Sequence, residues 1–256
     1  MEKDGAWIFL SHSNKDWNKV RKVRNYLEEK GNRPLLFFLK CMDDDQELDR
    51  LIKLEIESRS WFLLCDSENA QKSKWVQNEV SYIKQLTGKY YEAIDLNGPL
   101  HDQIDKINRL IKRATVYINH TRDDLDVGVN IAKELEKHDY ILKSFLDFGT
   151  DFSKSMTSLI REALDCGFVL FLLTQTSIFS TATIAEIEVA VEYAAKNNYM
   201  DYIIPITLVD PRYLMSVMPA HIKMLLYDLR WEDFSEGDFH QNIQSLVARM
   251  RDRRRD

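Results

Sequence analysis

The sequence predicts an α/β protein with two parallel sheets in tandem, each covered by helices on both faces. Short apolar runs alternate with longer amphipathic segments, which is the pattern of parallel strands joined by crossover helices. The chain also repeats itself once. Phe9–Asp16 matches Tyr117–Asp124, 108 positions later, and Pro34–Phe38 matches Leu142–Leu146 at the same offset. A repeat of this length predicts two domains rather than a solenoid.

The first copy contains four predicted strands. Each is a continuous apolar run and not an alternation of apolar and polar residues. Such runs are typical of strands buried on both faces of a sheet. The predicted strands are Ala6–Leu10, Pro34–Phe38, Trp61–Cys65 and Tyr90–Leu96. Helices are predicted between them, where apolar residues recur at helical spacing. The predicted helices are Asp16–Lys30, Leu48–Ser58 and a segment that begins at Ser73.

The boundary between the copies is expected after Arg113. Asn97-Gly98-Pro99 interrupts the chain, and a helix then leads to Arg113, so the predicted domains are residues 1–113 and 114–256. The second copy is longer, with a fifth strand expected at Leu225–Trp231 and a final helix from Phe239. Its first four predicted strands are Val116–Asn119, Tyr140–Leu146, Phe168–Leu173 and Tyr202–Leu208.

Composition excludes several classes of protein. The net charge of −6 argues against broad nucleic-acid binding, and the basic run Arg249–Arg255 is expected to decorate the end of the last helix. No apolar run is long enough for a membrane span, and Met1-Glu2-Lys3-Asp4 lacks the basic-then-apolar pattern of a signal peptide, so neither is expected. Three scattered cysteines and six single histidines indicate a reduced, cytoplasmic protein without a disulfide framework or a metal site.

A serine followed six residues later by a glutamate occurs in both copies, as Ser73 with Glu79 and as Ser180 with Glu186. The offset between the copies is 107 here, so one residue is expected to be lost in the loop before the serine. Trp75 lies four residues before Glu79, and residues at this spacing share one helix face. That face differs from the apolar stripe Val76, Val80 and Ile83, which is expected to face the sheet.

Simpler interpretations exist for each of these residues. Ser73 and Ser180 suit helix N-caps, Glu79 alone could be an exposed helix residue, and His12 and His120 could close turns. The repetition of the acidic position in register, after matching strands and loops, favours a site. The copies are unequal, because the second has Ala182 where the first has Trp75.

These residues resemble a bacterial Toll/interleukin-1 receptor (TIR) domain. The resemblance rests on Ser11-His12-Ser13 with Asp16, on Phe37-Phe38 with its acidic loop, and on Ser73, Trp75 and Glu79. The second copy, with Thr121, Asp124, Asp147, Gly149, Ser180, Glu186 and Ile203-Ile204-Pro205-Ile206, is similar to the same family. The resemblance implies two flavodoxin-like TIR domains in tandem, and the loop after the second strand would be the BB loop used in self-association.

The resemblance also implies an activity, cleavage of the bond between nicotinamide and ribose in NAD⁺, with NAD⁺ as the substrate and no further cofactor or metal. Glu79 is the expected catalytic residue and Glu186 the second candidate. The expected substrate-binding residues are Ser11, His12, Phe38, Lys40, Ser73 and Trp75. The first domain would hold the main site, and the second would be a partner or regulator that lends its loop Asp147–Ser153. Proteins of this kind, including those of the Thoeris anti-phage system, make a nucleotide signal for an effector protein.

Two other functions remain open from the sequence. The chain could be a non-enzymatic module that assembles with other TIR domains, without dependence on Glu79. It could also resemble a nucleoside deoxyribosyltransferase, which uses a glutamate against a ribosyl bond. No residue pattern distinguishes hydrolysis of NAD⁺ from cyclisation or transfer to another acceptor, and none identifies the trigger or the oligomeric state.

Overall fold

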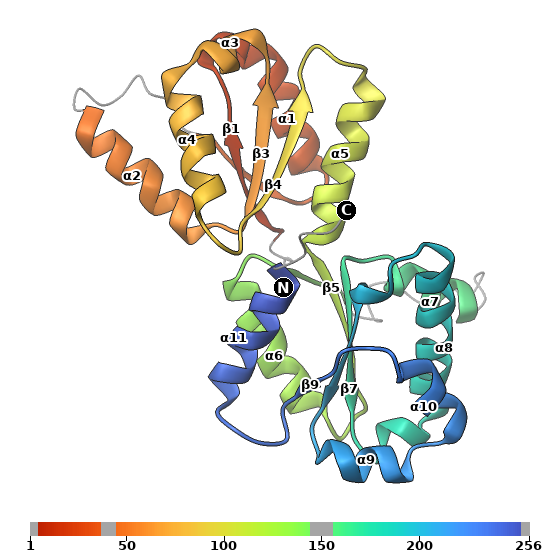
Figure 1. The fold of residues 1–256 in the computed structure, drawn as a ribbon. Coiled ribbons are helices and arrows are strands. Elements are labelled where there is room, and N and C mark those ends of the chain that lie inside the picture. Colours follow the sequence, from red (N-terminus) through yellow and green to blue (C-terminus); the bar gives the residue numbers. More distant parts are fainter. Residues whose placement is uncertain (1–4, 37–44, 144–155, 252–256) are drawn as a thin grey trace. The chain divides into compact units, whose positions relative to one another are not determined.

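The computed structural model describes residues 5–36, 45–143 and 156–251, and it divides into two compact units (Figure 1). The first unit comprises Met1–Ala114, His138–Ile141 and Arg251–Asp256, and the second comprises Thr115–Lys137 and Leu142–Met250. Each unit is built around a sheet of parallel strands flanked by helices, so the predicted fold class is confirmed.

The sheet of the first unit has the strand order β2-β1-β3-β4. Its strands are β1 (Trp7–Ser11), β2 (Arg33–Leu35), β3 (Trp61–Asp66) and β4 (Tyr90–Asp95). The central strands are mostly buried, and Phe9 of β1 pairs in parallel register with Phe62 of β3. The prediction that β4 is buried on both faces was wrong. As the edge strand it is largely half-buried, because only one neighbour covers it.

Helices on two sides of this sheet complete the first unit. The regular helices are α1 (Trp17–Glu29), α2 (Asp45–Ser58), α3 (Glu68–Lys72), α4 (Lys74–Gln85) and α5 (Leu100–Arg113), and a 3₁₀ turn, η1, spans Asn14–Asp16. The Tyr26 hydroxyl of α1 donates to Asn108 of α5, while α2 and α4 share a core cluster with β1 and β3. Gly31, just past α1, has a φ of 76°, the left-handed conformation expected at a helix C-terminus.

The sheet of the second unit has the order β6-β5-β7-β8-β9. Its strands are β5 (Thr115–Asn119), β6 (Ile141–Lys143), β7 (Phe168–Leu173), β8 (Ile203–Thr207) and β9 (Glu232–Asp233). Both β7 and β8 are buried along their whole length, because each lies between two other strands. The offset between the copies is 108 at β5 but already 107 at β7. The second copy is therefore one residue shorter at a point before β7. The sequence-based expectation, which placed this loss in the loop before Ser180, was wrong.

The fifth strand was predicted in the wrong place. Residues Ala220–Leu226 form helix α10, and the strand is the short β9 beyond them. The apolar run misled the prediction because its first two residues, Leu225 and Leu226, complete α10, where Leu226 is buried on the same face as Ile222, and the residues after them form a turn. The other helices are α6 (Leu125–Lys137), α7 (Met156–Leu164), α8 (Thr181–Lys196), α9 (Pro211–Val217) and α11 (Phe239–Arg251), with 3₁₀ turns η4 (Ser177–Phe179) and η5 (Met200–Tyr202).

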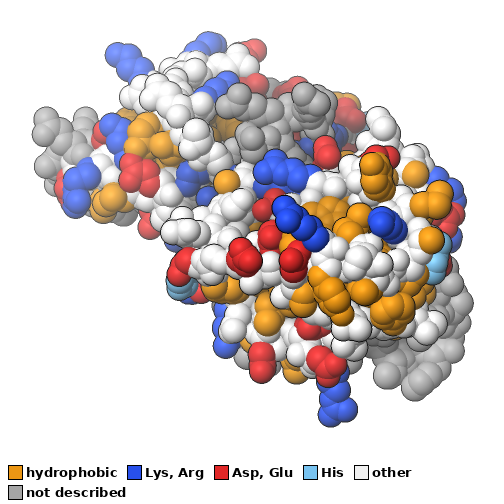
Figure 2. Space-filling view, turned by 60° about the horizontal axis from the view of Figure 1, so that its bottom comes forward, with side chains coloured by type: hydrophobic (Ala, Val, Ile, Leu, Met, Phe, Trp, Pro, Cys, Tyr) orange, Lys and Arg blue, Asp and Glu red, His pale blue; other side chains and the backbone are white. Residues whose placement is uncertain are grey.

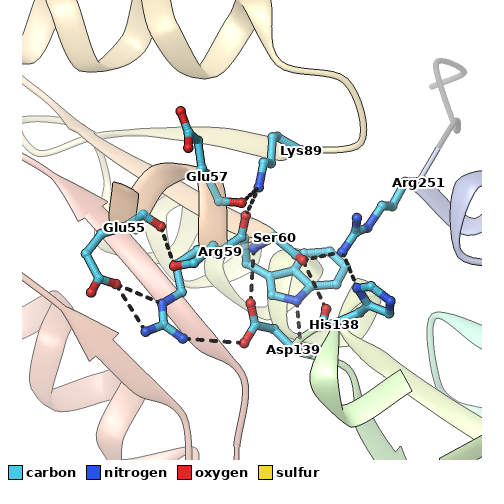
Figure 3. A network of polar contacts seen from close by, with 10 residues as sticks. Glu55, Glu57, Arg59, Ser60, Lys89, His138, Asp139 and Arg251 are labelled. Carbon is cyan, nitrogen blue, oxygen red and sulfur yellow. Dashed lines mark hydrogen bonds and ion pairs between the residues drawn. The ribbon is translucent and has the colours of Figure 1, made fainter. Parts of the chain in front are cut away.

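A network of polar contacts in the first unit joins the start of β3 to Asp139 (Figure 3). The Ser60 amide donates to the Asp139 carboxylate over 3.1 Å, and Trp61 Nε1 donates to the Asp139 carbonyl oxygen over 2.8 Å. Arg59 lies 3.8 Å from the same carboxylate, and Arg251 donates to the Ser60 hydroxyl over 2.8 Å. The first compact unit therefore includes two short stretches that the sequence places in the second copy.

Exposed apolar side chains gather over α9 and α10 of the second unit, on the face that Figure 2 brings forward. Met224 is 79% exposed and Tyr227 is 71% exposed, and Tyr213 of α9 is also exposed. All three are large side chains on or just after neighbouring helices of the chain, and exposed apolar surface of this kind is a candidate for protein contacts. We call these three residues the α9–α10 patch.

Candidate active site

The candidate site of the first unit lies at the carboxyl ends of β1 and β3, where ligands bind in open parallel sheets. Helix α4 supplies its acidic residue. Ser73 caps the helix, its hydroxyl accepting from the Val76 amide, so the serine sets where α4 begins. Val76 and Val80 are buried against the sheet, as predicted, and Trp75 and Glu79 share a different face.

Glu79 is held by the last residue of β1. The Ser11 hydroxyl donates to Glu79 Oε2 over 2.5 Å, across 68 residues of sequence. Burial raises the pKa of the Glu79 carboxyl to about 7, and the hydrogen bond from Ser11 opposes that rise. Glu79 is therefore close to half-ionised at neutral pH. A buried carboxyl with a pKa in this range is a common feature of catalytic sites.

A cavity of about 260 Å³ opens beside Glu79. Of the predicted site residues, His12, Ser73, Trp75 and Glu79 line it directly. His12 is half-buried, and its Nδ1 lies 3.0 Å from the Leu10 carbonyl oxygen, which places a proton on that nitrogen. Burial lowers the pKa of His12, so its imidazole is neutral at pH 7.

Ser11 reaches the site through its hydrogen bond to Glu79, so the structure brings together five of the predicted site residues of the first copy. Phe38 and Lys40 lie outside the described residues. So does the loop Asp147–Ser153, which the sequence analysis expected the second domain to lend.

Further lining residues are not among the predicted substrate-binding residues. They are Phe9, Leu10, Ser13, Asn14, Lys15, Asn69 and Lys72. The rule that ligands bind at the carboxyl ends of parallel strands had already placed the segments Ser11–Asn14 and Asp66–Lys72 at this edge from the sequence, without giving Ser13, Asn14, Asn69 or Lys72 a role of its own. Phe9 lies inside β1, and nothing in its apolar surroundings distinguishes it from a core residue.

Asp16 is a structural residue of this region. Its carboxylate accepts from the Ser67 hydroxyl over 2.5 Å and from Asn69 Nδ2 over 2.8 Å, which ties the loop after β3 to the start of α1. The second unit repeats this contact, because the Thr174 hydroxyl donates to Asp124 over 3.2 Å. The repeated acidic position after β1 and β5 therefore supports the loops around the site.

Glu186, the counterpart of Glu79, is held differently. The Tyr117 hydroxyl and Asn119 Nδ2 both donate to Glu186 Oε2, over 2.8 Å and 2.7 Å. Tyr117 and Asn119 occupy the positions of Phe9 and Ser11 in the first copy. Burial raises the pKa of Glu186 and the two hydrogen bonds oppose it. Glu186 is buried, with 9% of its surface exposed, in a polar cluster of the interior.

Two further features of the described residues complete the description. In residues 5–36, 45–143 and 156–251, no three His, Cys, Asp or Glu side chains come together in a way that would hold a metal ion. Across the same ranges, every helix is too short or too polar to cross a membrane.

The fold and site together define a class of α/β protein, with a doubly covered parallel sheet and a buried glutamate at its carboxyl edge. The family model for the TIR domain matches residues 8–97 and again residues 116–247. The chain therefore belongs to the TIR domain family, with a match in each half.

Other comparisons add little. No curated protein matches the chain. Among solved structures, a crystal structure of PH0766 from Pyrococcus horikoshii OT3 is similar at 10% identity, with a TM-score of 0.25. That match covers 96% of this chain, and the chain spans 64% of the length of that structure. A similarity at this level carries no argument about function.

Proposed function

We propose that the first unit cleaves the bond between nicotinamide and ribose in NAD⁺. The observation that supports this most is the position of Glu79, a buried carboxyl whose pKa is raised to about 7 beside a cavity of about 260 Å³. Membership of the TIR family is compatible with this activity.

The chemistry needs a carboxylate close to the reacting sugar. As the bond between C1′ and the nicotinamide nitrogen breaks, its electron pair leaves with nicotinamide, and positive charge develops on the ribose ring. The ionised form of Glu79 stabilises that oxocarbenium-like state. Nicotinamide departs as a neutral pyridine, so a strong general acid is not required. An acceptor then bonds to C1′, and water as the acceptor would give ADP-ribose and one proton.

The neighbours of Glu79 have separate roles in this proposal. Ser11 orients the carboxylate through its hydroxyl. Trp75 walls the cavity and stacks against the planar nicotinamide ring. His12, neutral at pH 7 with its proton on Nδ1, accepts a hydrogen bond from a ribose hydroxyl at Nε2, and Ser73 keeps the start of α4 in place.

The second unit is proposed to be a partner or regulator rather than a second active site. The carboxylate of Glu186 already accepts hydrogen bonds from Tyr117 and Asn119. Ala182 is found where the first unit has Trp75. The product is proposed to be an ADP-ribose-type nucleotide that a separate effector senses during anti-phage defence. This role follows from the TIR family resemblance alone.

The test is incubation of the purified protein with NAD⁺, with and without lysate of phage-infected cells, followed by chromatography and mass spectrometry. Wild type, Glu79→Gln and Glu186→Gln are compared. We expect nicotinamide release to fall by at least about a thousandfold in Glu79→Gln, as for loss of an electrostatic catalyst, and to persist in Glu186→Gln. The mass of the second product identifies the acceptor.

The opposite pattern, with Glu186→Gln inactive and Glu79→Gln active, would move the site to the second unit. Intact NAD⁺ under both conditions would remove the enzymatic proposal. Release of a free base from a deoxynucleoside, with NAD⁺ left intact, would favour a deoxyribosyltransferase.

A second candidate function, association between TIR domains, is favoured by the α9–α10 patch. We propose that the patch packs against the second unit of another copy of the chain. Met224, 79% exposed, is suited to a test because its replacement should leave the fold intact. Met224→Glu should lower the average mass seen by sedimentation at micromolar concentration, whereas His221→Glu, at an exposed position on the same helix, tests a non-specific charge effect. A mass that is equal in wild type and Met224→Glu would exclude the patch.

A further inference from the structure

Trp75 also lines a second cavity. It has a volume of about 580 Å³ and is lined by residues of α2 and α4. Trp75 lines both this cavity and the one beside Glu79, so the two cavities adjoin at this residue. We call them the glutamate cavity and the α2–α4 cavity.

The glutamate cavity is too small for the whole proposed substrate. Pockets that enclose a drug-sized ligand measure about 300–1,000 Å³, and the glutamate cavity, at about 260 Å³, lies below that range. It suits one nucleoside, such as the nicotinamide riboside half of NAD⁺. The adenosine diphosphate half must therefore lie outside it.

The α2–α4 cavity offers the chemistry that an adenine nucleotide needs. Trp75 and Tyr82 of α4 are half-buried aromatic rings, each packed partly on the core of the unit. Asn78 and Gln85 of the same helix are exposed amides that line the cavity. Aromatic rings stack on bases, and amide side chains can donate to and accept from the edge of adenine.

The charged residues of the α2–α4 cavity also suit a diphosphate. Lys53 pairs with Asp49 over 2.7 Å, so these two charges compensate each other. Lys74 is exposed, lines the same cavity, and makes no ion pair among the residues that the structure describes. The lining therefore carries one net positive charge, at the start of the helix that also carries Glu79.

The second unit indicates that the fold does not require this set of side chains. At the equivalent positions of α8, Ala182 replaces Trp75, Ala185 replaces Asn78 and Val189 replaces Tyr82. Ala185 and Val189 pack against the apolar core of that unit. The aromatic and amide face of α4 is thus a property of the first copy alone.

We infer that the α2–α4 cavity binds the adenosine diphosphate half of the dinucleotide whose nicotinamide riboside half occupies the glutamate cavity. This inference rests on the proposed function for its substrate. The dinucleotide would cross the edge of Trp75, with Lys74 near the diphosphate and Asn78 and Gln85 at the adenine. The cavity would then make the protein prefer a dinucleotide over a mononucleotide.

The experiment compares NAD⁺ with nicotinamide mononucleotide, which lacks the adenosine monophosphate portion. The variants are Lys74→Glu and the double variant Asn78→Ala/Gln85→Ala. The control is Gln77→Ala, an exposed position on the same helix that lines neither cavity. We expect each test variant to raise KM for NAD⁺ about tenfold, since one or two polar contacts are lost, while kcat remains. KM for nicotinamide mononucleotide should stay within about twofold in the double variant and in Gln77→Ala, because this probe lacks the adenine. Lys74→Glu should still raise it, because the probe keeps one of the two phosphates.

Direct binding separates this inference from the proposed function. Titration of ADP-ribose into the wild-type protein and into Glu79→Gln requires no turnover. The affinity for ADP-ribose should fall about tenfold in Lys74→Glu and in the double variant, and should be unchanged in Gln77→Ala. If no nicotinamide is released but this binding pattern holds, the function is wrong and the cavity assignment stands. ADP-ribose binding that is equal in all variants, or absent in the wild type, would overturn the assignment.

Discussion

The two glutamates Glu79 and Glu186 occupy the same position in two copies of one fold, yet their surroundings differ. Glu79 receives one hydrogen bond from the end of β1 and lines a cavity, whereas Glu186 receives two from β5 and lies in the interior. Two substitutions along the strand account for the contrast, Phe9 to Tyr117 and Ser11 to Asn119. A carboxyl repeated in both copies thus lines a cavity in one unit and is held by two donors in the interior of the other.

The difference shows why the position of an acidic residue alone does not define an active site. Both carboxyls have a raised pKa, and burial is the main cause in each case. The two carboxyls differ in the number of hydrogen bonds that they accept. Glu79 accepts one and lines a cavity, so its carboxylate has lone pairs left for a ligand, whereas Glu186 accepts two. The number of donors on the neighbouring strand decides whether the buried carboxylate is available to a ligand.

Among the variants that exchange features between the two units, the largest effect is expected for one that makes the first site like the second. Phe9→Tyr places a hydroxyl where Tyr117 has one, so it should donate to Glu79 and fill part of the cavity. A hydrogen bond to a charged group contributes about 1.5–3 kcal/mol, so nicotinamide release should fall about ten- to a hundredfold. The measurement is kcat/KM for NAD⁺. Phe9→Leu, which adds no hydroxyl, should retain more activity. Equal activity in Phe9→Tyr and wild type would break the comparison.

The reverse substitution tests the packing role of Glu186. Tyr117→Phe removes one donor and leaves the buried carboxyl with Asn119 alone, which should lower the free energy of unfolding by about 1–3 kcal/mol. Chemical denaturation measures this loss, and nicotinamide release should be unchanged. Tyr227→Phe, at a tyrosine that is 71% exposed, provides the control and should have almost no effect. A Tyr117→Phe protein as stable as wild type would mean that Glu186 does not depend on this hydroxyl.

The smallest effect concerns pH. Glu79 stabilises positive charge only when ionised, so kcat/KM should rise with pH through a midpoint of about 7. The Ser11 hydrogen bond lowers the pKa of Glu79, so Ser11→Ala should move the midpoint to higher pH and reduce activity at pH 7 about two- to fivefold. Ser11→Thr, which keeps the hydroxyl, should restore the original profile. A midpoint that is the same in Ser11→Ala and wild type would remove Ser11 from this role.

The raised pKa of Glu79 also has a consequence for stability. In the folded protein the pKa is about 7, above the ordinary value of 4.5, so the folded state holds this proton more tightly than the unfolded state. The contribution of Glu79 to stability is therefore complete below pH 4.5 and is lost as pH rises through about 7. Glu79→Gln, which cannot ionise, should raise Tm relative to wild type more at pH 8 than at pH 5. Equal differences in Tm at the two pH values would contradict the burial of this carboxyl.

Much of the candidate site was predictable because it depends on local periodicity. Trp75 and Glu79 share a helix face through their four-residue spacing, and Ser73 caps that helix. The rule that parallel strands gather their carboxyl ends at one edge brought Ser11 and His12 to the same place. None of these inferences requires a side-chain distance.

Other features were not predictable, because they depend on contacts between residues far apart in the chain. The pairing of Ser11 with Glu79 spans 68 residues, and the α2–α4 cavity exists only because α2 packs along α4. The pattern of the apolar run before β9 is compatible with a helix and with a strand. The burial of Ile222 and Leu226 on one face of α10 shows that its first part is helical.

The sequence by itself determined the parallel α/β architecture, the duplication and the position of the acidic residue in each copy, because all three are written in periodic apolar patterns. Only the tertiary structure decided which donors hold each glutamate and placed a cavity beside Glu79. The reason is physical. Hydrogen-bond donors and free volume around a buried carboxyl come from neighbouring strands, and a one-dimensional pattern does not record which donors those strands bring within reach.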